Sequence, residues 1–215
     1  MSDIRDGKTY TVRKMADGNC WMAENLKLEL EANKTYTGVN NTTGEPITFN
    51  TGAACTTNGA CVMNGNTAYD STYDSWYYSW YAATAGSGTS SMVNQDAPYS
   101  ICPTHWRLPT NYTNTSYPSG GAPKSWGTLV KAYGISPENH DSDSEWQTLV
   151  GQPFSLPMAG YFNSGVFQNV GIGHLRSATA YTAAGAYYLA FRTVRVYPQN
   201  YSSKYDGFNV RCVAI

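Results

Sequence analysis

The clearest alternation of apolar with other residues lies near the C-terminus, in the segment AYYLAFRTVRVYP at residues 186–198. Period-two spacing in a segment rich in aromatic and β-branched residues predicts a strand with one packed face and one presented face. A presented face is where we expect binding to occur. The apolar members of the segment are Ala186, Leu189, Phe191, Val194 and Val196, and Arg192 and Arg195 lie between the last three.

The N-terminal half alternates less regularly. Residues 7–12 are predicted to form a first strand, and residues 27–72 form a long polar insertion rich in Thr, Asn and Gly. We expect one or two β-hairpins in this insertion. Residues 73–83 (YDSWYYSWYAA) suit either a strand or a short helix. We interpret their aromatic side chains as core residues, with a contact patch as the alternative.

Helical spacing is found in the middle of the sequence. Apolar residues recur at helical intervals in residues 124–133, and Gly134 is placed to end that helix. A second helix is predicted to begin at residues 141–143 and to run to Val150. Residues 154–157 then lead back into strands. This order predicts an α+β fold in a single domain spanning residues 1–215.

Composition excludes several classes of protein. Charged residues make up 13% of the 215 residues, about half the usual share, and the formal net charge is −1. Nucleic-acid binding needs a basic footprint, so we expect no nucleic-acid partner. No apolar run of about 18 residues occurs, so we expect no direct membrane insertion. No signal peptide is visible in this sequence, yet its 18 tyrosines and its cysteines favour a secreted or cell-surface protein.

Two of the five cysteines are close in sequence. Cys55 and Cys61 enclose TTNGA, whose Asn58-Gly59 pair is a strong turn signal, so we predict a local disulfide across a tight hairpin. Such a bridge would add ~2 kcal/mol to stability. No partner follows at zinc-ligand spacing. We expect Cys20 to be a buried free thiol.

Five blocks of sequence resemble one family. The blocks are Trp21–Leu26 (WMAENL), Ile101–Thr110 (ICPTHWRLPT), Glu145–Leu149 (EWQTL), Leu156–Tyr161 (LPMAGY) and Gly207–Val213 (GFNVRCV). In this order they resemble the motifs of the Fibrobacter succinogenes major paralogous domain family. The resemblance implies a C-type-lectin-like fold, in which two short helices flank small antiparallel sheets and the N- and C-terminal strands pair. It also implies that Cys102 and Cys212 lie within bridging distance, and such a bridge would add ~5 kcal/mol.

One segment departs from the family. Where members read YWSST, this protein has His174–Thr179 (HLRSAT). The residues expected to be framework are retained: Ser177, Thr179, Ala186, Tyr187, Leu189, Phe191, Val196, Gly207, Phe208, Arg211 and Cys212. An irregular mixture at the positions between them resembles the variable region of proteins diversified by retroelements. This resemblance implies that residues 160–215 hold a ligand-binding face.

We therefore expect a non-enzymatic module that presents side chains of its C-terminal strands to a protein ligand. Tyr and Arg suit such a surface because they are enriched at interface hot spots. A structural cell-envelope or adhesion role with a fixed partner is the alternative. The expected ligand-binding residues are His174, Leu175, Tyr181, Tyr188, Ala190, Arg192, Arg195, Tyr197 and Tyr201.

Catalytic and metal chemistry find little support in the sequence. His105, His140 and His174 lie in no recognised nucleophile or metalloprotease motif. A disulfide at Cys102 would remove its thiolate. Three carboxylates at residues 141–145 could suit Ca²⁺, but an acidic helix start explains them more simply. We expect no catalytic residue, metal or cofactor.

Overall fold

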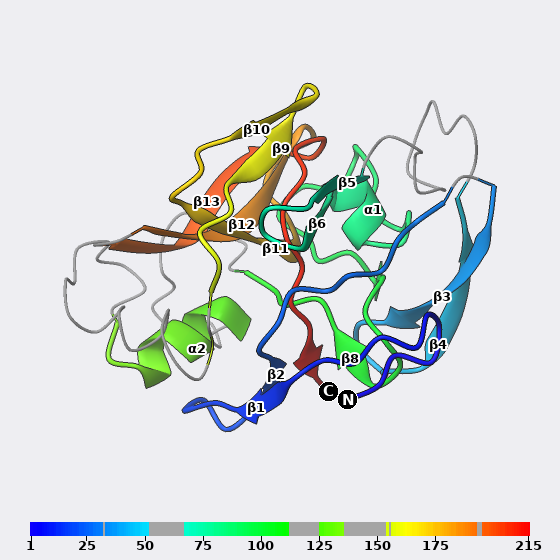
Figure 1. The fold of residues 1–215 in the computed structure, drawn as a ribbon, viewed down its shortest axis with the longest axis horizontal. Coiled ribbons are helices and arrows are strands. Elements are labelled where there is room, and N and C mark those ends of the chain that lie inside the picture. The colour runs from blue at the N-terminus through cyan, green and yellow to red at the C-terminus, as the bar shows by residue number, and fades with distance from the viewer. Residues whose placement is uncertain (32, 52–66, 112–124, 136–153, 155, 193–194) are drawn as a thin grey trace.

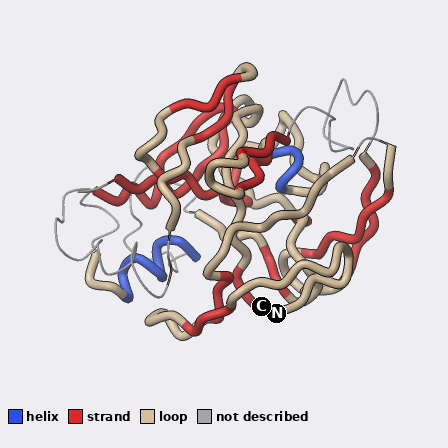
Figure 2. Tube along the Cα trace, viewed as in Figure 1, coloured by secondary structure: helices blue, strands red, loops and turns tan. Residues whose placement is uncertain are grey.

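The structure is a computed structural model that describes residues 1–31, 33–51, 67–111, 125–135, 154, 156–192 and 195–215. It shows small antiparallel sheets with two short helices, so the α+β prediction is confirmed (Figure 2). Cys55, Cys61 and the predicted helix at 141–150, with its three carboxylates, lie outside the described residues. No helix in the described ranges is long and apolar enough to cross a membrane.

Strands outnumber helices throughout the described ranges. The helices are α1 (Trp80–Ala83) and α2 (Ser125–Ala132). The strands are β1 (Val12–Lys14), β2 (Cys20–Met22), β3 (Thr35–Asn40), β4 (Pro46–Asn50), β5 (Thr67–Asp70), β6 (Ser75–Tyr78), β7 (Tyr99–Ser100), β8 (Trp106–Arg107), β9 (Tyr161–Asn163), β10 (Val166–Gln168), β11 (Gly173–Ala180), β12 (Gly185–Arg192), β13 (Arg195–Ser203) and β14 (Val213–Ala214).

The two ends of the protein meet in a sheet of order β1-β2-β14-β8. Val213 of β14 pairs with Trp21 of β2, and the two termini lie side by side (Figure 1). The first strand spans Val12–Lys14, so it shares only Val12 with the strand predicted at residues 7–12. Gly7, at a φ of +73°, lies in a turn that brings Thr9 back to bridge Ser2, so this stretch closes a small N-terminal loop instead.

The C-terminal strands form a second sheet of order β11-β12-β13. Leu189, Phe191 and Val196 are buried in one core cluster together with Trp21 and Trp126. The predicted packing is therefore confirmed for these three residues; Ala186 is buried in a separate cluster with Trp80, and Val194 lies outside the described residues.

The insertion contains the antiparallel hairpin β3–β4, as expected, and β5 pairs with β6. Residues 73–83 form both a strand, β6, and a helix, α1. Tyr77, Tyr78 and Trp80 are fully buried, which confirms the core interpretation for these three rings. Helix α2 agrees with the predicted helix at 124–133, and Gly134 follows it at a φ of +79°.

A disulfide joins Cys102 to Cys212 across 110 residues, with a Cα–Cα distance of 5.9 Å. Both residues are fully buried in the core cluster that contains Met22, Leu26 and Val210. A disulfide is typical of proteins that fold in an oxidising, extracellular environment. Cys20 is a free thiol but only half-buried, so its expected burial is wrong: it lies at the outer end of β2, and the strand becomes fully buried only from Trp21 onward.

Candidate ligand-binding site

A cavity of about 310 Å³ opens over one face of the β11–β13 sheet. On β12 the lining positions alternate, because side chains two residues apart share a face of a strand. The cavity is lined by Tyr188, Ala190 and Arg192 of β12, by Tyr197, Asn200 and Ser202 of β13, and by Tyr161, Asn169, Ile172, His174 and Phe208. Its volume falls at the lower end of the range of about 300–1,000 Å³ found for small-molecule pockets.

A β-bulge places the β13 residues around this cavity. Tyr188 pairs with Asn200, but Ala190 pairs with Tyr197, so β13 holds one extra residue between these two pairs. The bulge coincides with Pro198, which has no backbone N–H to donate to the ladder. Tyr197 and Asn200 therefore line the same cavity although they are three residues apart.

His174 lies among aromatic rings at the floor of the cavity. Its ring centroid is 5.2 Å from those of Tyr161 and Phe208 and 5.3 Å from that of Tyr188. Burial lowers the pKa of His174 to about 4; hydrogen bonding of the imidazole to the backbone of Gly160 and Ile172 opposes this drop, and the charges of Arg176 and Arg192 add to it. Nδ1 of His174 is buried without a hydrogen-bond partner in the described part of the protein.

Arg176 lies behind the cavity, fully buried, with Cζ 4.0 Å from the centroid of the Phe208 ring. Its Nη2 donates to the carbonyl oxygen of Asp206, while Nε and Nη1 have no partner among the described residues. The Asp206 carboxylate accepts instead from Asn163, at 2.6 Å, and from Ser202. Burial lowers the pKa of Arg176 to about 9.

Arg192 stands at the rim of the cavity. It is the one exposed residue of β12, and its Cζ lies 5.9 Å from the centroid of the Tyr197 ring. Among the described residues, the lining contains no Asp or Glu side chain. Positive charge therefore lies at the rim, on Arg192, while the charge of Arg176 behind Phe208 is partly offset by the nearby Asp206 carboxylate.

The cavity brings together five of the nine predicted binding residues: His174, Tyr188, Ala190, Arg192 and Tyr197. Four of these five side chains, all except Arg192, are less exposed to solvent than the side chains of an open strand face would be. Strand β12 is buried along its whole length up to Arg192. The expectation of an open face is wrong because Tyr161 and Phe208 cover the side of the sheet opposite the core.

Three of the other predicted residues lie elsewhere, and the side chain of the fourth, Arg195, is outside the described part of the protein. Leu175 is buried in the core opposite Leu189, so its assignment to the binding face is wrong: it follows His174 and points to the other side of β11. The rings of Tyr181 and Tyr201 are tilted against each other, with their centroids 4.3 Å apart, outside the cavity lining. The backbone of Arg195 pairs with that of Arg192.

Several lining residues were missed from the sequence. Tyr161 and Phe208 belong to the family-like blocks LPMAGY and GFNVRCV, and Phe208 was assigned to the framework. Asn200 and Ser202 could have been found only from the β12–β13 register, which a bulge shifts.

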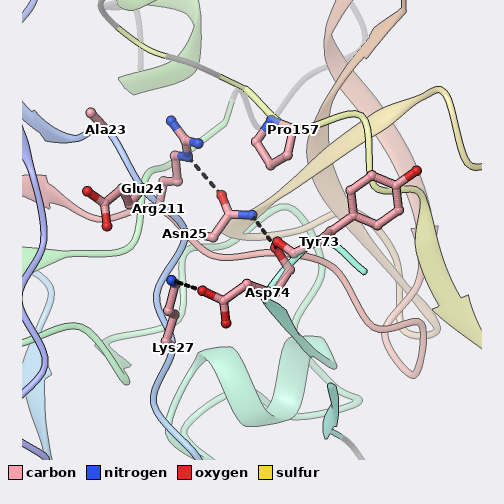
Figure 3. A pocket seen from close by; sticks show the side chains of 9 residues that line it. Ala23, Glu24, Asn25, Lys27, Tyr73, Asp74, Pro157 and Arg211 are labelled. Carbon is pink, nitrogen blue, oxygen red and sulfur yellow. Dashed lines mark hydrogen bonds and ion pairs between the residues drawn. The ribbon is translucent and has the colours of Figure 1, made fainter. Parts of the chain in front are cut away.

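A second pocket, of about 210 Å³, lies where the first and last sequence blocks meet (Figure 3). Arg211 donates from Nε to Oδ1 of Asn25 at 2.8 Å and from Nη1 to the carbonyl oxygen of Phe154. Asn25 in turn donates to Ser75 at 3.2 Å. The polar motif residues Asn25 and Arg211 therefore serve mainly to tie the two ends of the fold together.

At the mouth of this second pocket, Lys27 forms an ion pair with Asp74 (Figure 3). Because its charges are already compensated by neighbouring polar groups and carbonyls, we regard this pocket as structural. Within the described ranges, no three His, Cys, Asp or Glu side chains are grouped so that they could hold a metal ion. Comparisons of the sequence and structure with protein-family models, with curated proteins and with solved structures found no match.

Proposed function

We propose that this protein is a non-enzymatic ligand-binding module with a C-type-lectin-like fold, secreted or displayed on a cell surface. Its binding site is the cavity over β11–β13, with Arg192 at the rim, and its partner is a protein ligand. The observation that carries the proposal is the cavity itself: it combines aromatic walls with His174, whose buried Nδ1 lacks a partner in the described protein, and Nε and Nη1 of Arg176, behind Phe208, lack partners as well. Natural interiors rarely leave such groups unpaired without a functional reason.

Three features support the fold assignment. The N-terminal strand β2 pairs with the C-terminal strand β14, as the resemblance implies, and Cys102 is bonded to Cys212. The contact between Asn25 and Arg211 joins the WMAENL and GFNVRCV blocks. A rigid frame of this kind tolerates substitutions at sites that do not contribute to the core.

A selection experiment tests the binding function. A displayed peptide library is panned against the wild-type protein and against Ala190→Trp, in which a large ring fills the cavity. A Val93→Trp variant, altered at an exposed position outside the cavity lining, is the control. We expect peptides that bind wild type and V93W but not A190W. If every enriched peptide binds A190W equally well, the cavity is not the binding site.

We further propose that the site is diversified by a retroelement. The structure sharpens the pattern expected if the gene is sequenced from several cells of its source population. Codons for cavity residues such as His174, Tyr188 and Arg192 vary, while those for Leu175 and Leu189, buried in the core, do not. Variation spread evenly over core and cavity codons, or no variation, would reject diversification.

The alternative, a structural or adhesive role in the cell envelope, is favoured by a different observation. Tyr201 and Tyr205 are 55% and 62% exposed, and each contacts another tyrosine ring, Tyr181 and Tyr81 respectively. Exposed tyrosines suit a fixed interface. Concentration-dependent self-association that is lost in Tyr201→Ser/Tyr205→Ser, and that is unaffected by A190W, would favour this role.

A further inference from the structure

The chemistry of the cavity allows its ligand to be narrowed. We infer that the cavity binds a carboxylate group of the ligand, from an Asp or Glu residue or from the C-terminus of a polypeptide, and that Arg192 and His174 recognise it. This inference rests on the proposed ligand-binding function and names the chemical group that the site accepts.

The first observation is the sign of the charge. Arg192 at the rim is cationic, and the described lining residues include no acidic side chain to neutralise it. Behind the wall, the guanidinium of Arg176 lies against the face of Phe208, and the charge of the nearby Asp206 carboxylate, which accepts from Ser202, partly offsets it. The cation that the ligand meets is therefore Arg192, and a cation beside a partly enclosed space favours an anion there, since charges interact more strongly away from bulk water.

The second observation is the set of unmet hydrogen bonds. His174 belongs to this lining, and its Nδ1 is buried without a partner in the described part of the protein. Nε and Nη1 of Arg176, deeper in the wall, are also buried without a hydrogen-bond partner among the described residues. Buried polar groups without partners are costly, and a ligand that satisfies one of them regains that free energy on binding.

The third observation is the aromatic wall. Tyr161, Tyr188, Tyr197 and Phe208 surround the polar floor and leave about 310 Å³. This space accepts one amino-acid side chain or the last residue of a polypeptide and excludes a folded surface. Arg, with its planar donor fork, matches a carboxylate in two parallel hydrogen bonds.

The second pocket differs from this cavity in that its charged side chains already have partners. There Lys27 is paired with Asp74, and Arg211 donates to Asn25 and to a backbone carbonyl. Its cations are already compensated. Only the β11–β13 cavity, of these two, combines cations with unmet hydrogen bonds.

The test is an NMR titration of the whole protein with three small probes. Acetyl-Glu-N-methylamide offers the carboxylate of a Glu residue, acetylglycine offers a terminal one, and acetyl-Gln-N-methylamide is the neutral match of the first. We expect saturable shifts of the β12 amides and of the Arg192 Nε–H signal. We expect the Gln probe to bind about tenfold more weakly than the Glu probe, because hydrogen bonds to charged groups are the stronger ones. The stronger of the two acidic probes identifies the source of the carboxylate.

A matched pair of variants gives the control. Arg192→Gln is expected to bind the Glu and Gln probes equally, whereas Arg13→Gln, at an exposed position of β1, is expected to keep the tenfold preference. Both arginines are exposed, so neither change disturbs the core. A preference that persists in R192Q overturns the role of Arg192.

The outcomes separate this inference from the proposed function. Equal binding of the Glu and Gln probes to wild type overturns the carboxylate inference and leaves ligand binding intact. The same holds if peptides that depend on the open cavity are selected but contain neither an acidic residue nor a free C-terminal carboxylate. If no cavity-dependent peptide is selected and no probe binds, the proposed function and the inference fail together.

Discussion

Removing the Cys102–Cys212 disulfide tests whether this bridge is the main cross-link that stabilises the fold. The bridge closes a loop of 110 residues. In the loop-entropy treatment, closing a loop of that length removes about 16 cal/mol/K from the unfolded state, or about 5 kcal/mol at 25 °C. Domains of this kind are stable by roughly 5–15 kcal/mol, so the loss is a third of the total or more. We expect Cys102→Ala/Cys212→Ala to unfold at much lower urea concentration.

The measurement is urea unfolding followed by tryptophan fluorescence, since Trp21, Trp80 and Trp126 are fully buried. The single variant Cys102→Ala also lacks the bridge. The step from single to double variant therefore reports the lost packing of the second sulfur alone. A total loss below about 1 kcal/mol would refute the loop-entropy reasoning.

Three further changes have expected outcomes. Folding lowers the pKa of His174 from its ordinary value of 6.5 to about 4, so the unfolded protein binds a proton first as pH falls. Stability is therefore lost between pH 6.5 and 4, by about 3 kcal/mol from this group, and His174→Phe should flatten that part of the urea-unfolding profile. Gly173→Ala places a Cβ 1.7 Å from the Phe191 ring and should lower stability by about 1–3 kcal/mol in thermal unfolding. Asn25→Leu removes the acceptor of the buried Arg211 Nε and should cost about 3 kcal/mol by the same assay.

Each of these expectations has its own control. A pH profile of His105→Phe, an exposed histidine, should match that of wild type. Gly185→Ala meets its nearest atom, Thr182 Oγ1, at 3.0 Å, so it should cost far less than Gly173→Ala. Asn25→Asp restores an acceptor for Arg211 and should recover most of the stability that N25L loses. If the two variants of a pair changed stability, or its pH profile, by the same amount, the contacts described for that pair would be contradicted.

Much of the framework was predictable from sequence. The alternation at residues 186–198 predicted which side chains enter the core, and Leu189, Phe191 and Val196 do so. Helical spacing predicted α2, and the glycine after it marked its end. These features depend on local periodicity and on turn chemistry, which a sequence displays directly.

The binding site was predictable only in part, because it depends on what covers each face of a strand. A strand pattern shows which residues share a face but not whether that face is open. Here Tyr161 and Phe208, far apart in sequence, enclose the side that alternation assigned to solvent. The strand face that was predicted to be open is therefore the wall of a cavity, and His174 is buried.

By itself the sequence determined the class of fold, the order of most elements and, through its resemblance to a family, the Cys102–Cys212 bridge. Tertiary structure decided the geometry of the site. The bulge at Pro198 shifts the register of β13 by one residue, so Tyr197 joins Asn200 at the cavity while Tyr201 lies outside it. A one-residue shift exchanges the two faces of a strand, and it is fixed by pairing with a neighbouring strand rather than by local composition.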